Sequence, residues 1–136
     1  MIRRIARELV VQSLFQIDFS GCTAEEALAA AVEEHNTKDA VKAQHYAQLA
    51  ISGILNAKAD IDAKIQEFSI DWEIERMPGV DRNILRLAVY EIYYAEEKIP
   101  AGIAINEAVE IAKLYGSEDS PRFINGLLGK MVRNNE

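Results

Sequence analysis

The residues that catalysis and metal binding require are present in this chain, but not at the spacing that those chemistries need. His35 follows two glutamates directly and so lacks the Glu-x-x-His spacing of a di-iron bundle, and His45 has no clustered ligand partners. Cys22 is the only cysteine and has no nearby base, which excludes an intrachain disulfide and a cysteine zinc site. Glu107 and Glu110 are three residues apart, as on a solvated helix face. We predict no catalytic residues, no metal and no cofactor, and therefore not an enzyme.

A cluster of arginines near the N-terminus has a spacing that suits phosphate binding. Arg3, Arg4 and Arg7 lie within five positions of an otherwise acidic chain. Arg4, Val11 and Phe15 follow a helical stripe offset from the apolar one, so we expect that stripe to face solvent. Three arginines gathered on one helix form a local positive site of the kind that contacts nucleic-acid phosphates.

A second segment, residues 116–126, combines a helix stop and a helix start with groups that can bind RNA. Ser120 is expected to be the N-cap of the last helix. Arg122 and Asn125 lie three residues apart at the N-terminus of that helix, where free N–H groups attract anions. Phe123 has two interpretations: its ring either stacks on an unpaired base or packs into the core.

The composition limits what these residues can do. The chain has 136 residues, 15 Lys and Arg against 22 Asp and Glu, and a net charge of −7. This length predicts a single domain over residues 1–136. The acidity excludes a clamp that holds nucleic acid over the whole surface, so a nucleic-acid site must be a local patch. No apolar stretch is long enough for a membrane span, and we expect a cytoplasmic protein with no membrane partner.

Helices must position these residues, because apolar residues recur at helical spacing and no long stretch alternates with period two. Thr23 and Glu26 form a predicted capping box, and Gly116 a predicted helix stop. The most apolar segment, 80–96, is expected to be the central helix. We predict an all-α fold with about six or seven helices, over residues 2–18, 23–32, 43–57, 60–68, 80–96, 103–112 and 120–131.

Four ordered motifs resemble the NusB family of bacterial transcription antitermination factors. They are Arg-Arg-Ile-Ala-Arg-Glu at 3–8, Ile-Leu-Arg-Leu-Ala-Val-Tyr-Glu at 84–91, Ala-Ile-Asn-Glu-Ala-Val-Glu-Ile-Ala-Lys at 104–113, and Gly-Ser-Glu-Asp-Ser-Pro-Arg-Phe-Ile-Asn-Gly at 116–126. The resemblance covers nearly the whole chain and is weakest over residues 22–71. It implies an all-helical fold made of two small helical bundles.

The resemblance also implies a function. Members of this family bind the boxA RNA of nascent ribosomal RNA transcripts together with NusE, a small-subunit ribosomal protein, and help the RNA polymerase antitermination complex to read through terminators. By motif match, the implied RNA-binding residues are Arg3, Arg4, Arg7, Asp119, Arg122, Phe123 and Asn125. The implied NusE-binding residues are Phe15, where the family often has tyrosine, Glu75 and Asp81.

One alternative stays open and a second is set aside. A protein-only helical interaction module or a homodimer would use the same fold and would show no salt-dependent RNA binding. The N-terminal region of a ribosomal RNA cytosine methyltransferase also resembles this family, but that reading requires a cofactor-binding domain after residue 136. We therefore expect an RNA-binding adaptor and keep the protein-only module as the alternative.

Overall fold

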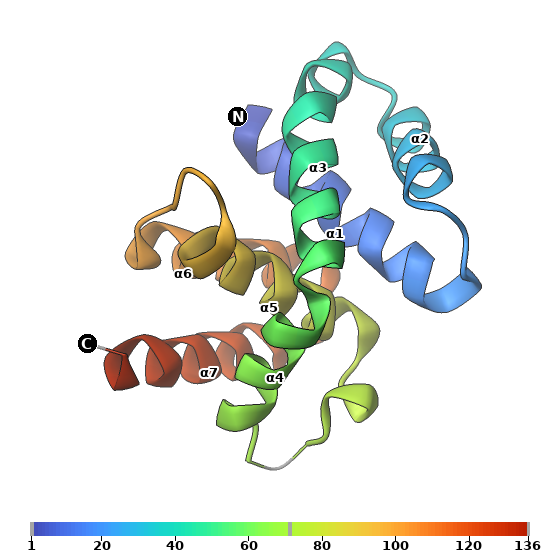
Figure 1. The fold of residues 1–136 in the computed structure, drawn as a ribbon. Coiled ribbons are helices and arrows are strands. Elements are labelled where there is room, and N and C mark those ends of the chain that lie inside the picture. Colours follow the sequence, from blue (N-terminus) through green and yellow to red (C-terminus); the bar gives the residue numbers. More distant parts are fainter. Residues whose placement is uncertain (1, 71, 136) are drawn as a thin grey trace.

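The computed structural model describes residues 2–70 and 72–135, and every regular element within them is helical (Figure 1). This confirms the predicted all-α fold. The described residues form seven α-helices and two short helical turns. They are α1 (Ile2–Ser20), α2 (Ala24–His35), α3 (Lys38–Asn56), α4 (Lys58–Phe68), the 3-10 turn η1 (Ile74–Arg76), α5 (Gly79–Val89), the π-helical turn η2 (Tyr90–Tyr94), α6 (Ala101–Tyr115) and α7 (Ser120–Asn134).

The helices form two groups that share one core. Helices α1, α2 and α3 pack together in the upper part of Figure 1, and α4 to α7 form the lower part. Helix α5 packs against α1, α4, α6 and α7, so it occupies the central position predicted for it. Fully buried side chains such as Leu9, Ile51, Ile84 and Leu128 belong to a single hydrophobic cluster that spans both groups.

Local sequence signals fix several helix starts. The Thr23 hydroxyl accepts a hydrogen bond from the Glu26 N–H at 3.1 Å, and the Thr23 N–H donates to the Glu26 carboxylate at 3.0 Å. This reciprocal pair is the predicted capping box. Thr37 caps α3 in a similar way by accepting from the Ala40 N–H at 3.1 Å. Both caps satisfy backbone donors that the first helical turn leaves unpaired.

The predicted continuous helix over 80–96 is interrupted. Helix α5 ends at Val89 and continues as the wider turn η2, which is closed by the Ala95 N–H donating to the Tyr90 carbonyl at 2.8 Å. Five residues of apolar pattern cannot distinguish this turn from ordinary α-helix, because the two differ by only one residue per hydrogen-bonded ring. The turn carries Glu91, which is buried at the junction of the two helical groups.

Ser120 is not the N-cap of α7, contrary to the prediction. Asp119 holds the cap position without a side-chain hydrogen bond, and Ser120 is the first helical residue. The Ser120 hydroxyl accepts from the Ser117 N–H at 2.9 Å, and a Cβ at Gly116 would lie 2.5 Å from that oxygen. Gly116 is therefore required for the close approach of the Ser120 side chain to the backbone at the turn between α6 and α7.

None of the described helices is long and apolar enough to cross a membrane.

Candidate nucleic-acid and partner interfaces

Arg7 lies inside the molecule, whereas we expected it on a solvent-facing patch. Its residue is 5% exposed, and its Nε donates to both carboxylate oxygens of Glu91 at 2.9 Å. Its Nη1 also donates to Glu107 at 3.3 Å. Glu91 and Glu107, both from the C-terminal helical group, cover its guanidinium. Val11, on the predicted outward stripe of Arg4, Val11 and Phe15, is also buried, so the prediction that this stripe faces solvent is wrong at that position.

Arg4 is half-buried and forms a bidentate ion pair with Glu107 of α6. The hydrogen bonds from the Arg4 guanidinium lower the pKa of Glu107, and burial opposes this shift. The Glu107 side chain is therefore not part of a solvated face, as its spacing from Glu110 had suggested. Glu110 instead pairs with Lys113 at 2.8 Å on the outer side of α6.

Arg3 is the exposed member of the arginine cluster. Its guanidinium carbon lies 4.0 Å from the centre of the Tyr46 ring, a cation–π contact. The Tyr46 hydroxyl donates to Glu91 at 2.6 Å, and burial raises the pKa of Tyr46. Tyr46 and Glu91 thus complete a polar network that links α1, α3, η2 and α6. Sequence reasoning missed both residues, because their partners are distant in the chain.

The residues predicted on α7 are better placed for a ligand. Asp119, Arg122 and Asn125 are all exposed at the N-terminal end of this helix. Phe123 is half-buried: it packs against the core, and its ring lies 5.2 Å from the Trp72 ring at an interplanar angle of 59°. This packing agrees with the core interpretation of Phe123, and stacking on an unpaired base stays a prediction. Trp72, which had no predicted role, is 42% exposed beside it.

Two of the three predicted partner residues lie on a shared surface at the C-terminal end of α1. Phe15 is 37% exposed and stacks on Phe19, with ring centres 6.1 Å apart. A Cβ at Gly79 would lie 2.8 Å from the Phe15 ring, so the glycine lets α5 begin directly against it. Glu75 is exposed in η1, and Arg82 joins this turn to α1 by bonding the Glu75 carbonyl at 3.4 Å and Asp18 at 3.2 Å.

Asp81 is buried, which corrects the expectation that its carboxylate faces a partner. It is 3% exposed and accepts a hydrogen bond from the Ser120 hydroxyl at 2.7 Å. Burial raises its pKa, and the hydrogen bond from Ser120 opposes that shift. The physical role visible in this geometry is to tie the start of α5 to the start of α7.

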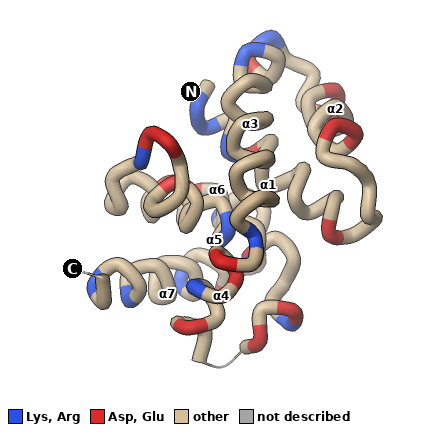
Figure 2. Tube along the Cα trace, viewed as in Figure 1, with Lys and Arg blue, Asp and Glu red and all other residues tan. Residues whose placement is uncertain are grey.

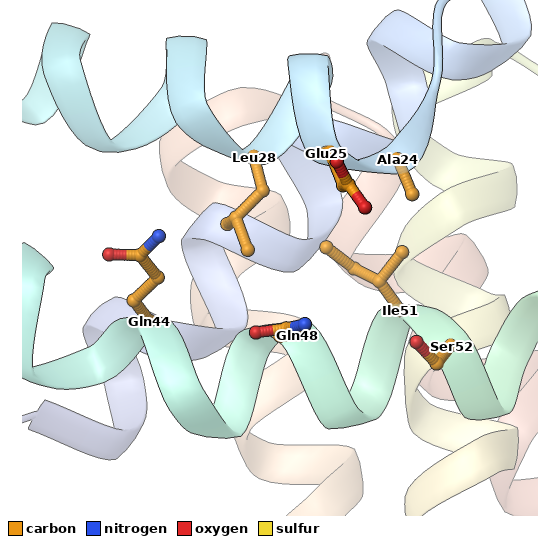
Figure 3. Close-up of a pocket in the computed structure, with 7 residues that line it drawn as sticks. All are labelled: Ala24, Glu25, Leu28, Gln44, Gln48, Ile51 and Ser52. Atoms are coloured by element: carbon orange, nitrogen blue, oxygen red, sulfur yellow. The ribbon is translucent and has the colours of Figure 1, made fainter.

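The cavity between α2 and α3 has no nucleophile paired with a base. A cavity of about 250 Å³ lies between α2 and α3, where Leu28 and Ile51 face each other beside Gln44 and Gln48 (Figure 3). Ser52 is the one hydroxyl in its lining, and no histidine or lysine lines this cavity to activate it. Within residues 2–70 and 72–135, no group of three His, Cys, Asp or Glu side chains is arranged to hold a metal ion.

These features define a class: an all-helical protein of two joined bundles, with exposed polar and aromatic side chains at the start of its last helix. A family model described as the NusB family matches residues 4–133. The chain belongs to the NusB family.

Individual relatives agree over almost the full length. The chain is 46% identical to the transcription antitermination protein NusB of Pelotomaculum thermopropionicum over 136 residues, which is 100% of this chain and 92% of the relative. A solved structure of T. maritima NusB is 39% identical, with a TM-score of 0.83, and the match covers 96% of this chain and 90% of that one. A structure of the antitermination factors NusB and NusE in complex with dsRNA is 28% identical, with a TM-score of 0.83 and coverage of 98% and 97%.

Proposed function

We propose that the protein is a transcription antitermination factor that binds the boxA RNA of nascent ribosomal RNA transcripts together with NusE and supports read-through by RNA polymerase. The observation that carries this proposal is the NusB family match over residues 4–133. The likeness to a NusB chain solved with NusE and dsRNA supports it. In this role the protein is a cytoplasmic adaptor that binds RNA and a partner protein and catalyses no reaction.

The RNA contacts fall at two places. Arg3 and Arg4 attract phosphates at the start of α1, and Asp119, Arg122, Phe123 and Asn125 bind nucleotides at the start of α7. Helix α6 connects the two places, because it packs against α7 and its Glu107 holds Arg4. Exposed polar groups of α7 reach base edges, and the partly exposed Phe123 ring offers a stacking face.

Arg7 has a different role within the same proposal. Its guanidinium is satisfied by two carboxylates, so it does not compete well for a phosphate. It instead fixes the position of Glu107 and, through that carboxylate, of Arg4. We therefore treat Arg7 as a positioning residue for the RNA site rather than as a residue that touches RNA.

Phe15 and Glu75 contact NusE. The Phe15 side chain is partly exposed, and Glu75 is exposed. A ribosomal protein is a basic partner, and the net charge of −7 on this chain favours its approach. Asp81 contributes indirectly, since its bond to Ser120 orders the elements next to this surface. The partner also supplies positive charge that this acidic protein lacks.

Native mass spectrometry of the protein with NusE and a short boxA RNA tests the proposal. We expect a complex with one copy of each component, and a smaller yield when the boxA sequence is scrambled. Arg122→Glu should remove RNA while NusE stays bound, and Glu75→Lys should remove NusE. A spectrum that contains only the monomer or a homodimer under all conditions would overturn the proposal in favour of the protein-only alternative.

A further inference from the structure

Helix α7 is the most basic of the described helices in this acidic protein. Its fifteen residues include three basic side chains and no acidic one. Arg122, Lys130 and Arg133 are exposed and fall on one face of the helix, and blue bands along α7 mark them in Figure 2. The Arg133 guanidinium lies back over Gly129, toward the start of the helix. The NusB-family motif at 116–126 covers only the first half of this face.

A groove runs beside the basic face. We call it the α7 groove. It has a volume of about 240 Å³ and is lined by Phe68, Ser69, Ile70, Phe123, Gly126, Leu127 and Lys130. Its rim is unusually apolar for an exposed position: Ile70 is 79% exposed, and the half-exposed Trp72 packs on Phe123. Exposed apolar surface next to basic side chains suits a ligand that has both flat apolar faces and negative charge.

The position of Gly126 indicates that a ligand lies on the helix. Gly126 is an exposed residue in the middle of α7, and a Cβ there would meet nothing within 4 Å. Glycine at such a position costs about 1 kcal/mol relative to alanine, and no contact within the protein requires it. A missing side chain does, however, let a ligand approach the helix backbone closely. Gly126 lies between Arg122 and Lys130, four residues from each.

We propose that the α7 groove binds an unpaired nucleotide of single-stranded RNA, with its base against Gly126 and Ile70 and its flanking phosphates at Arg122 and Lys130. Those two residues lie one turn before and one turn after Gly126, so basic side chains flank the glycine along the helix. The apolar lining suits the free face of an unpaired base, which a duplex keeps stacked between its neighbours. This inference rests on the proposed RNA-binding function and carries the RNA path toward the C-terminus of α7.

Two glycine variants test the groove in the full-length protein with NusE and labelled boxA RNA. Gly126→Ala should weaken RNA binding at least about fivefold in an anisotropy titration and leave the melting temperature equal or higher. Gly102→Ala is the matched control, because Gly102 is an exposed glycine of α6 with nothing within 4 Å of its Cβ position. It should leave RNA affinity unchanged. A loss of affinity in both variants, or in neither, contradicts the proposal.

A lysine variant provides a second measurement. Lys130→Ala should reduce the slope of log affinity against log salt by about 0.7, the value for one phosphate contact on a single strand. Lys98 is an exposed lysine before α6, and Lys98→Ala should leave the slope unchanged.

If wild-type protein binds RNA and neither Gly126→Ala nor Lys130→Ala changes that binding, the groove inference fails and the proposed function stands. If wild-type protein binds no RNA, the proposed function fails. If either variant weakens NusE binding and leaves RNA binding unchanged, the groove binds a protein and the inference is wrong.

Discussion

At the scale of single residues, the arginine cluster divides into three different environments. Arg3 is exposed, Arg4 is half-buried in an ion pair, and Arg7 is almost fully buried between two glutamates. The sequence shows three similar basic residues within five positions, but not this division. The carboxylates that bury Arg7 are 84 and 100 positions away, and local spacing carries no information about them.

We predict that Arg7→Ala destabilises the fold by about 3–5 kcal/mol, because it leaves the buried Glu91 carboxylate without its main partner. Chemical denaturation with constant m-value measures this change. Arg3→Ala is the matched control on the same helix and should cost about 1 kcal/mol or less, since it removes one exposed cation–π contact. Equal costs for the two variants would contradict the assigned burial of Arg7.

The Glu107 carboxylate should make stability depend on pH in a defined direction. Its folded-state pKa is lowered by the hydrogen bonds from Arg4, so it contributes stability above its ordinary pKa of 4.5. That contribution is lost as the pH falls through the lowered value. The free energy of unfolding of Glu107→Gln should therefore be about 1 kcal/mol below that of wild type at pH 7. This difference should shrink as the pH is lowered. A stability difference that grows on acidification would contradict this assignment.

At the scale of elements, apolar periodicity and caps identified all seven helices, and the boundaries set by Thr23 and Gly116 were predicted correctly. Two local features could not be predicted. The π-helical turn η2 has the same apolar pattern as an α-helix. Ser120 precedes a proline, as an N-cap residue often does, but its hydroxyl donates a hydrogen bond to Asp81 instead of capping the helix. Both depend on contacts between elements that lie far apart in sequence.

The packing of α3 on η2 gives a further prediction at this scale. A Cβ at Gly53 would lie against the Tyr90 ring, 3.0 Å from its Cζ atom. Gly53→Ala should therefore destabilise the protein by about 1–3 kcal/mol, as expected for an overpacked contact. Thermal unfolding of Gly53→Ala beside Gly102→Ala, where a Cβ meets open space, measures the difference. A Gly53→Ala variant as stable as its control would show that η2 does not pack on α3 in this way.

At the scale of the whole molecule, two helical groups share one core and are joined by the network around Arg7 and Glu91. Helix α6 contacts the start of α1 through the Arg4–Glu107 ion pair and also packs against α7. The resemblance of the motifs to the NusB family predicted the fold and the function class. It did not show that Asp81 and Arg7 are buried, or that Trp72 packs beside Phe123.

The central claim is that an acidic helical adaptor binds boxA RNA together with NusE. Fluorescence anisotropy of a labelled boxA RNA, titrated with this protein alone and with NusE at two salt concentrations, tests that claim most directly. We predict tighter binding with NusE, a preference over scrambled RNA, and a modest salt slope of about −0.7 for each phosphate contact. No RNA binding under any of these conditions would contradict the account and leave a protein-only module with the same fold.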